Sequence, residues 1–240
     1  MPSRRGLCRC WIVLATGLLG IAASAFAAAQ TPTRMPHADV SRRYLALGDS
    51  YTIGEAVPAT ARWPVVLAER LRKDGVTIDD PQIIAVTGWT TDELMAAIDR
   101  AAPTPDNALV TLLIGVNNQY RGRPVGEYRQ QFATLLARAV ALAGRRAGRV
   151  VVVSIPDWGI TAFGQQDVRG ATRIGAELND FNAIARDETL RAGARWVDIT
   201  GISRQHAALV ADDGLHPSAA QYALWVEAIL PVARQALRQP

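Results

Sequence analysis

The sequence has few of the residues and motifs that bind metals, phosphates or nucleotides. It contains two cysteines, Cys8 and Cys10, and three histidines. No cluster of His, Cys, Asp or Glu has metal-ligand spacing, and neither a glycine-rich phosphate loop nor a dinucleotide fingerprint occurs. The Gly-x-Ser-x-Gly turn of the larger α/β-hydrolases is also missing. These absences argue against metalloenzymes, nucleotide-binding enzymes and the larger α/β-hydrolases. They predict a protein that works without a metal or cofactor.

The N-terminus accounts for most of the formal net charge of +4. Residues 1–29 have the pattern of a secretion signal, because Arg4, Arg5 and Arg9 precede an apolar stretch that ends in Ala-x-Ala sites. Cleavage would remove both cysteines and three of the 26 basic residues, but none of the 22 acidic ones, leaving a net charge of about +1. A disulfide framework and a nucleic-acid partner are therefore not expected.

An uncleaved membrane anchor is the alternative for this segment, because no charge occurs between Arg9 and Arg34. The stretch is rich in alanine and glycine, so its insertion into a bilayer would be marginal. We expect a cleaved signal peptide at 1–29, a linker at 30–42 and one domain at 43–240. The mature protein would be periplasmic or secreted, without stable membrane insertion.

Beyond the linker, short apolar runs alternate with segments of helical periodicity. The expected strands are 44–47, 83–86, 108–114, 149–155 and 194–199, and the expected helices are 63–72, 93–101, 125–146, 172–192 and 219–237. Continuous apolar strands that alternate with helices are typical of parallel sheets covered on both faces. The sequence therefore predicts a three-layer α/β/α sandwich with a central, mostly five-stranded parallel sheet.

Polar side chains occur in the loops after the strands, where ligands bind in such sheets. Ser50 follows the first strand, and Asp213 lies three residues before His216. A serine hydroxyl becomes a nucleophile when an imidazole removes its proton, and a carboxylate can orient that imidazole. A helix cap at Ser50 and an ordinary surface hydrogen bond between Asp213 and His216 are the alternatives.

Two further residues could stabilise a negatively charged oxygen. Asn117 follows the third strand and Gly88 follows the second. An amide side chain and the backbone N–H groups of Ser50 and Gly88 can together bind the oxyanion of a tetrahedral intermediate. A cap or a turn is the alternative for each residue. Trp89 and Trp158 occur beside these loops and could line the site or pack in the core.

In this order, the elements resemble the four sequence blocks of the GDSL-type, or SGNH, hydrolases. The blocks read Gly48-Asp49-Ser50-Tyr51, Gly88, Gly115-Val116-Asn117-Asn118 and Asp213-Gly214-Leu215-His216-Pro217. The resemblance covers residues 43–238. Tyr51 stands where the family name has leucine, and Asn118 stands where the third block usually has aspartate. We expect the second difference to alter local support of the site rather than its chemistry.

The resemblance implies a flavodoxin-like SGNH hydrolase fold and a serine esterase that forms an acyl-enzyme, and the signal pattern predicts that this esterase is exported. Ser50 would be the nucleophile, His216 the base and Asp213 its orienting carboxylate. Ser50, Gly88 and Asn117 would form the oxyanion hole, with no metal or cofactor.

The implied substrates are small-molecule, lipid or carbohydrate esters, such as short-chain acyl esters, lysophospholipids or thioesters. A polysaccharide O-acetyl deacetylase of the same fold and a non-catalytic binding protein are the alternatives. An aliphatic wall near the site would favour a short-chain or lysophospholipid esterase. An open cleft with polar and aromatic side chains would favour the deacetylase.

Overall fold

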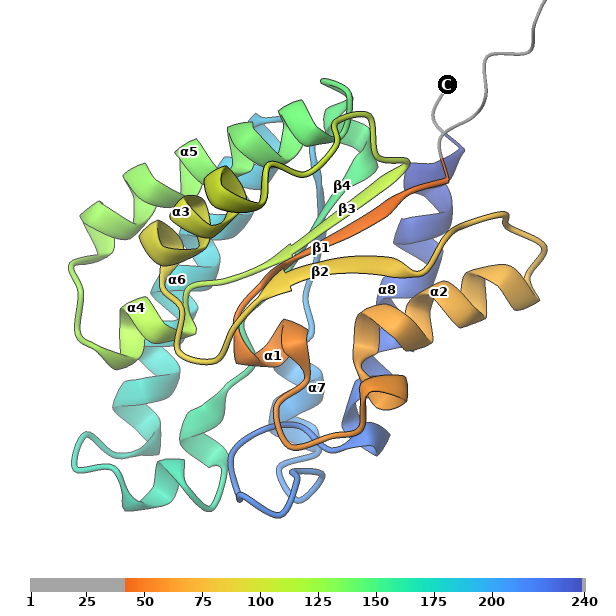
Figure 1. Cartoon of the computed structure of the whole chain (residues 1–240). Coiled ribbons are helices and arrows are strands. Elements are labelled where there is room, and N and C mark those ends of the chain that lie inside the picture. The colour runs from red at the N-terminus through yellow and green to blue at the C-terminus, as the bar shows by residue number, and fades with distance from the viewer. Residues whose placement is uncertain (1–41, 239–240) are drawn as a thin grey trace, which may run out of the picture. The chain divides into compact units, whose positions relative to one another are not determined.

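A five-stranded parallel sheet forms the centre of the structure, a computed structural model that describes residues 42–238 (Figure 1). The strands are β1 (Tyr44–Gly48), β2 (Pro81–Ala85), β3 (Leu109–Leu113), β4 (Val150–Val153) and β5 (Arg195–Val197). Their order is β2-β1-β3-β4-β5, and all neighbours are parallel. The predicted signal segment at 1–29, and all but the last residue of the predicted linker, lie outside the described residues.

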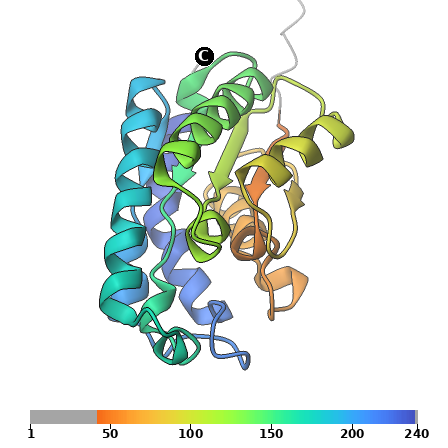
Figure 2. The same ribbon diagram turned by 90° about the vertical axis from the view of Figure 1, so that its left-hand side faces the viewer.

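Long helices cover both faces of the sheet, which confirms the predicted three-layer architecture. The helices α3 (Thr91–Ala101), α5 (Val125–Leu142) and α6 (Ala171–Arg191) lie on one face, and α2 (Trp63–Lys73) and α8 (Ala219–Leu237) lie together on the other (Figures 1 and 2). Each turns an apolar stripe toward the strands, as α5 does with Tyr128, Phe132 and Leu135. Among the described residues, no helix has the length and apolar character needed to span a membrane.

Every residue of β1, β3 and β4 is buried, because helices cover these central strands on both sides. The edge strands β2 and β5 keep partly exposed residues. A polar residue inside the sheet is satisfied locally, since the hydroxyls of Tyr44 and Thr111 share a hydrogen bond of 3.1 Å. The rigid centre of the sheet therefore supports the loops that follow β1 and β3.

The observed elements match the predicted ones in type and differ at their ends. The helix predicted to reach residue 146 ends at Leu142, because Gly144 and Arg145 have φ of +67° and +62°, which a helix cannot accommodate. The strand predicted at 83–86 begins at Pro81, which pairs with Tyr44 of β1. This pairing is a tertiary contact that sequence periodicity does not report.

Short helices were not predicted. They are α1 (Ser50–Ile53), α4 (Val116–Tyr120) and α7 (Thr200–Gln205), with the 3-10 turns η1 (Ala59–Ala61), η2 (Ala147–Arg149), η3 (Trp158–Ile160) and η4 (Gly164–Gln166). One or two turns are too short to show apolar periodicity. Both α1 and α4 lie at the carboxyl end of the sheet (Figure 1).

The strand order reverses between β1 and β3, since β1 connects to β2 on one side while β3 leads on to β4 on the other. Connections leave in opposite directions at such a switch point, which opens a crevice beyond the carboxyl ends of the two strands. In this structure, α1 follows β1 and α4 follows β3 at that point.

Candidate active site

A cavity of about 250 Å³ lies at the carboxyl ends of the central strands. Four of the predicted site residues line it, namely Ser50, Gly88, Asn117 and His216. The remaining lining residues are mostly apolar: Tyr51, Thr87, Val116, Tyr120, Trp158, Phe163 and Leu215. The structure thus brings residues from four separate loops to one small space.

Ser50 is presented by a tight turn between β1 and α1. A Cβ atom on Gly48 would lie 2.1 Å from the Thr52 Oγ1 and 2.5 Å from the Leu113 carbonyl oxygen, so only glycine fits there. Asp49 then caps α1, because its Oδ1 accepts a hydrogen bond of 3.1 Å from the Tyr51 N–H. Within residues 42–238 the Ser50 hydroxyl has no hydrogen bond to a protein group, which leaves it available to a base and a substrate.

Asp49 is fully buried directly beside Ser50. Burial raises the pKa of Asp49 to about 7, although the hydrogen bond from the Tyr51 N–H opposes this change. Its Oδ2 has no hydrogen-bond partner among the described residues. Below neutral pH this carboxyl is therefore mainly uncharged.

The turn at residues 213–216 forms a compact pair of side chains. The Nδ1 of His216 lies 2.6 Å from the Oδ2 of Asp213, and the N–H groups of Leu215 and His216 each donate to the Oδ1 at 2.9 Å. Gly214 has a φ of +69°, which lets the chain turn back between the two side chains. Because Asp213 occupies Nδ1, the Nε2 of His216 is the ring nitrogen left for another group.

The same contacts set the charge of Asp213. Partial burial opposes ionisation of this carboxylate, but the hydrogen bonds from the His216 ring and from the two N–H groups outweigh it and lower the pKa of Asp213. The imidazole of His216 is itself buried and meets the ring of Tyr51 edge-on, with centroids 5.7 Å apart. The ring therefore has a fixed position beside the cavity.

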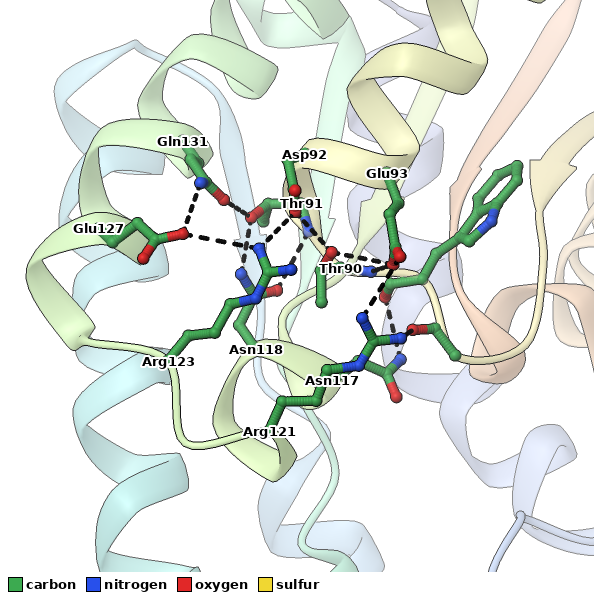
Figure 3. A network of polar contacts seen from close by, with 12 residues as sticks. Thr90, Thr91, Asp92, Glu93, Asn117, Asn118, Arg121, Arg123, Glu127 and Gln131 are labelled. Carbon is green, nitrogen blue, oxygen red and sulfur yellow. Dashed lines mark hydrogen bonds and ion pairs between the residues drawn. The ribbon is translucent and has the colours of Figure 1, made fainter.

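Gly88 and Asn117 also line the cavity, and Asn117 belongs to a polar network (Figure 3). The Nδ2 of Asn117 donates to the carbonyl oxygen of Trp89 at 3.0 Å. Gly88 has a φ of +87°, and its carbonyl accepts a hydrogen bond of 2.6 Å from the Nη2 of Arg121. Trp89 itself packs against the core with its side chain half-buried and does not line the cavity.

Asn118 is fully buried and links α4 to the start of α3 (Figure 3). Its Oδ1 accepts from the Thr91 N–H at 3.1 Å, and its Nδ2 donates to the Thr91 Oγ1 at 2.8 Å. An aspartate has no N–H with which to make the second bond. The Thr91 hydroxyl donates its own proton to Gln131, so its oxygen needs a donor as partner. The amide of Asn118 supplies that donor.

An aromatic wall, which we define as Tyr120, Trp158 and Phe163, lines another side of the cavity. The Trp158 centroid lies 5.4 Å from that of Tyr120 and 6.1 Å from that of Phe163. Trp158 is buried and donates from Nε1 to the Gln119 Oε1 at 2.9 Å, whereas Tyr120 and Phe163 are 46% and 40% exposed. The guanidinium of Arg169 lies over the rings of Tyr120 and Trp158 at 5.5 and 5.1 Å.

The aromatic wall is joined to the Asp213–His216 turn through the backbone. The N–H of Phe163 donates to the carbonyl of Gly214 at 3.0 Å. Tyr120 and Phe163 were not predicted as site residues, because nothing in their sequence neighbourhoods marks them. Trp158 was a candidate for both lining and packing, and it does both.

No group of three or more His, Cys, Asp or Glu side chains within residues 42–238 is arranged to hold a metal ion. The groups that converge on the cavity are a hydroxyl, an imidazole paired with a carboxylate, an amide and backbone N–H groups. Such a set can transfer an acyl group by nucleophilic attack, proton transfer and oxyanion binding.

Comparisons with known proteins point to the same chemistry. A model described as the GDSL-like Lipase/Acylhydrolase family matches residues 46–224. No curated protein matches at a significant level.

Solved structures share the fold at low sequence identity. The psychrotrophic esterase EstA from Pseudoalteromonas sp. is 17% identical, with a TM-score of 0.60 over 83% of this chain and 100% of that one. A phospholipase A1 from Streptomyces albidoflavus NA297 is 17% identical, with a TM-score of 0.61 over 82% of this chain and 99% of that one. An acetyl xylan esterase from Geobacillus stearothermophilus is 17% identical, with a TM-score of 0.60 over 80% of this chain and 94% of that one. Similarity at this level shows the fold alone.

Proposed function

Because the chain belongs to the GDSL-like lipase/acylhydrolase family and is an ester-hydrolysing serine hydrolase, we propose that it cleaves carboxylic esters through an acyl-enzyme on Ser50. The observation that carries this proposal is the single cavity lined by Ser50, His216, Gly88 and Asn117, with Asp213 bonded to His216. A non-catalytic binding protein would not need these five groups around one small space.

The proposed reaction has two halves that use the same groups. The Ser50 Oγ attacks the carbonyl carbon while the His216 Nε2 takes the hydroxyl proton. The imidazolium then gives this proton to the leaving alcohol, the ester C–O bond breaks, and the acyl group remains on Ser50. A water molecule repeats the attack with His216 as base, and the acid and free Ser50 are released. Throughout, the Asp213 carboxylate accepts a hydrogen bond from the Nδ1–H of His216 and stabilises the imidazolium.

Three N–H donors supply the proposed oxyanion hole. Ser50 is the first residue of α1, so its N–H has no intrahelical acceptor. The N–H of Gly88 is in none of the backbone hydrogen bonds of its turn. The Nδ2 of Asn117 uses one N–H for the Trp89 carbonyl and retains a second one. Donors at fixed positions stabilise the oxygen most when it becomes negative.

The cavity supports an ester with a short acyl group as the substrate. A volume of about 250 Å³ lies below the usual range for drug-sized ligands, so it suits a small group. Val116 and Leu215 add aliphatic surface, which was expected for a short-chain or lysophospholipid esterase. A carbohydrate O-acetyl deacetylase is the second candidate, because Tyr120 and Phe163 form an exposed aromatic rim of the kind expected for that activity.

Ester chain-length and alcohol series would test this function. We expect turnover of p-nitrophenyl acetate or butyrate, and Ser50→Ala or His216→Ala should lower kcat by about a thousandfold or more. His206→Ala is the matched control, since His206 follows the last residue of α7 and does not line the cavity. Undiminished turnover by folded Ser50→Ala would refute the nucleophile assignment. Faster release of acetate from acetylated xylan than from simple esters would favour the deacetylase.

We also propose that the protein is exported and acts in the periplasm or outside the cell. The support is the signal pattern of residues 1–29. N-terminal sequencing of extracytoplasmic protein should give a start near Ala28 or Gln30. Recovery of intact protein that still begins at Met1 would contradict cleavage.

A further inference from the structure

We propose that Arg121 is a positioning residue that fixes the spacing between the two outer donors of the oxyanion hole, the Gly88 N–H and the Asn117 amide. This inference rests on the proposed esterase function. It concerns a residue that lines no part of the cavity and that carried no signal in the sequence.

Arg121 and Asn117 belong to the same helical turn. Arg121 follows the last residue of α4, and its backbone N–H donates to the carbonyl of Asn117 at 3.0 Å. Its guanidinium reaches across to the turn after β2, where Nη2 donates to the Gly88 carbonyl at 2.6 Å (Figure 3). A charged donor at this distance makes one of the stronger kinds of hydrogen bond.

The turn at Gly88 needs such support because its own backbone is permissive. Gly88 has a φ of +87°, and a Cβ atom placed on it would find no neighbour closer than 3.7 Å. A glycine in open space can rotate its peptide groups at little steric cost. The Trp89 N–H closes this turn on the Val86 carbonyl, but at 3.3 Å this bond is long. The direction of the Gly88 N–H therefore also depends on what holds the neighbouring peptides.

Two consecutive carbonyl groups of this turn are held by side chains of the α4 turn. Arg121 binds the carbonyl of Gly88, and Asn117 binds that of Trp89 at 3.0 Å. The two bonds leave the turn little freedom to rotate or slide against α4. Together with the turn bond from the Trp89 N–H to the Val86 carbonyl, they restrict how far the Gly88 N–H can move from the free N–H of Asn117.

Arg121 is in turn anchored to the start of α3, immediately beyond the turn (Figure 3). Its Nη1 donates to the Glu93 Oε1 at 3.3 Å, while the Glu93 Oε2 accepts from the Thr90 N–H at 2.8 Å in a capping box. The Thr90 hydrogen bond, and then Arg121, lower the pKa of Glu93 and keep it ionised. Arg121 and Glu93 are 42% and 40% exposed in their side chains, so their ion pair adds little to stability. Its effect is on geometry.

Arg123 provides a matched control two residues further along. Its Nη1 pairs with Asp92 at 2.7 Å and with Glu127 at 3.6 Å, so it also links this loop to α3. It has no hydrogen bond to Gly88, Trp89 or Asn117. Arg123→Met therefore removes a comparable surface ion pair without touching the oxyanion donors.

The test compares Arg121→Met, Arg121→Lys and Arg123→Met on one p-nitrophenyl ester. We expect Arg121→Met to lower kcat by about ten- to a hundredfold with KM changed less than about threefold, because a small displacement of a donor weakens mainly the transition state. Arg121→Lys should lie between, since one ammonium cannot bind Gly88 and Glu93 as the two guanidinium nitrogens do. Arg123→Met should stay within about twofold of the wild type.

A trifluoromethyl ketone analogue of the ester gives a second readout, because it adds to serine and places a negative oxygen in the hole. Its Ki for Arg121→Met should rise by the same factor by which kcat/KM falls, while both methionine variants melt at similar temperatures. Equal kcat losses in the two methionine variants, or a change in KM alone, would overturn the positioning role. Ser50→Ala distinguishes failure of the proposed function from failure of the inference about Arg121. If Ser50→Ala remains active, the proposed function fails and the inference fails with it. If it is inactive while Arg121→Met is normal, only the inference fails.

Discussion

Two walls of the active-site cavity are held by different forces. The wall of Gly88 and Asn117 is fixed by directional hydrogen bonds that join the turn after β2, the start of α3 and α4. On the aromatic wall, the exposed rings of Tyr120 and Phe163 make ring contacts without side-chain hydrogen bonds to the described residues. Trp158 adds one side-chain hydrogen bond, to Gln119, and Arg169 lies over the rings of Tyr120 and Trp158. Hydrogen bonds fix distance and angle, whereas ring packing tolerates small shifts.

This difference suggests a division of labour between the walls. Oxyanion donors must lie about 2.7–3.1 Å from the oxygen that becomes negative, so a small displacement weakens the bond and their wall needs directional support. A substrate group that packs against rings needs shape and apolar surface rather than a fixed angle. Substitutions on the polar wall should therefore change kcat, and those on the aromatic wall should change KM.

The strongest test of the polar wall is Asn117→Ala. This change removes a proposed oxyanion donor, and loss of one such donor typically lowers kcat by about a hundred- to a thousandfold. We expect KM to change only a few-fold, because the donor acts on the transition state. Steady-state kinetics with a thermal melt would check this. Normal turnover with an early melt would mean that Asn117 is only a turn residue.

Asn118→Ala should show the reverse pattern on the same helix. It removes both hydrogen bonds to Thr91 from a fully buried position and leaves the Thr91 N–H without that acceptor. Such a loss costs about 1–3 kcal/mol of folding stability, while kcat should fall far less than in Asn117→Ala. Asn118→Asp is the control, because its carboxylate can still accept from the Thr91 N–H. Urea melts of both variants would measure the effect; equal stability of wild type and Asn118→Ala would contradict it.

On the aromatic wall, Phe163→Ala should raise KM about three- to tenfold and leave kcat near the wild-type value. Phe163 contributes one exposed ring to the cavity, and a ring contact of this kind is worth about 1 kcal/mol. The alanine variant keeps the backbone N–H that bonds to Gly214, so the turn of His216 should remain in place. A loss confined to kcat would show that the two walls do not divide the work in this way.

The sequence was sufficient to predict the sheet, because β1, β3 and β4 are uninterrupted apolar runs whose burial dictates their position. It also placed Ser50, Gly88 and Asn117 after β1, β2 and β3, and these three line one cavity with His216, which lies in the loop between α7 and α8. Parallel strands bring such loops to one edge wherever they lie in the chain. The catalytic roles of these residues remain predictions.

Some residues that hold or line the site without a catalytic role could not be predicted from the sequence. Arg121, Tyr120 and Phe163 lie in one- or two-turn helices or loops, where no periodicity reports a partner. The bond from Arg121 to Gly88 joins residues 33 positions apart, and it depends on how α4 lies against the turn after β2. Surface arginines are common, and only the tertiary arrangement distinguishes Arg121 from Arg123.

The smallest effect concerns the carboxylate of Asp213, which is bonded to His216 beside the cavity. The pKa of Asp213 is lowered in the folded state, so its ionised form adds stability at pH values above the unfolded pKa of about 3.9. This contribution is lost as the pH falls through the lower, folded pKa. Because the side chain is 34% exposed, solvent screens the pair, and we expect less than about 1 kcal/mol.

Asp213→Asn isolates this term, because its amide oxygen can still accept from the Leu215 and His216 N–H groups. A variant is needed because Asp49 acts in the opposite direction: burial raises its pKa to about 7, so its ionisation costs stability as the pH rises. Asp49 contributes equally to both proteins and cancels in their difference. Urea melts from about pH 3 to 7 should show the wild type slightly more stable at the upper end, with the gap closing toward pH 3. A gap that stays constant over this range would mean that the charge of Asp213 adds nothing to folding, and that its hydrogen bonds alone hold the turn of His216.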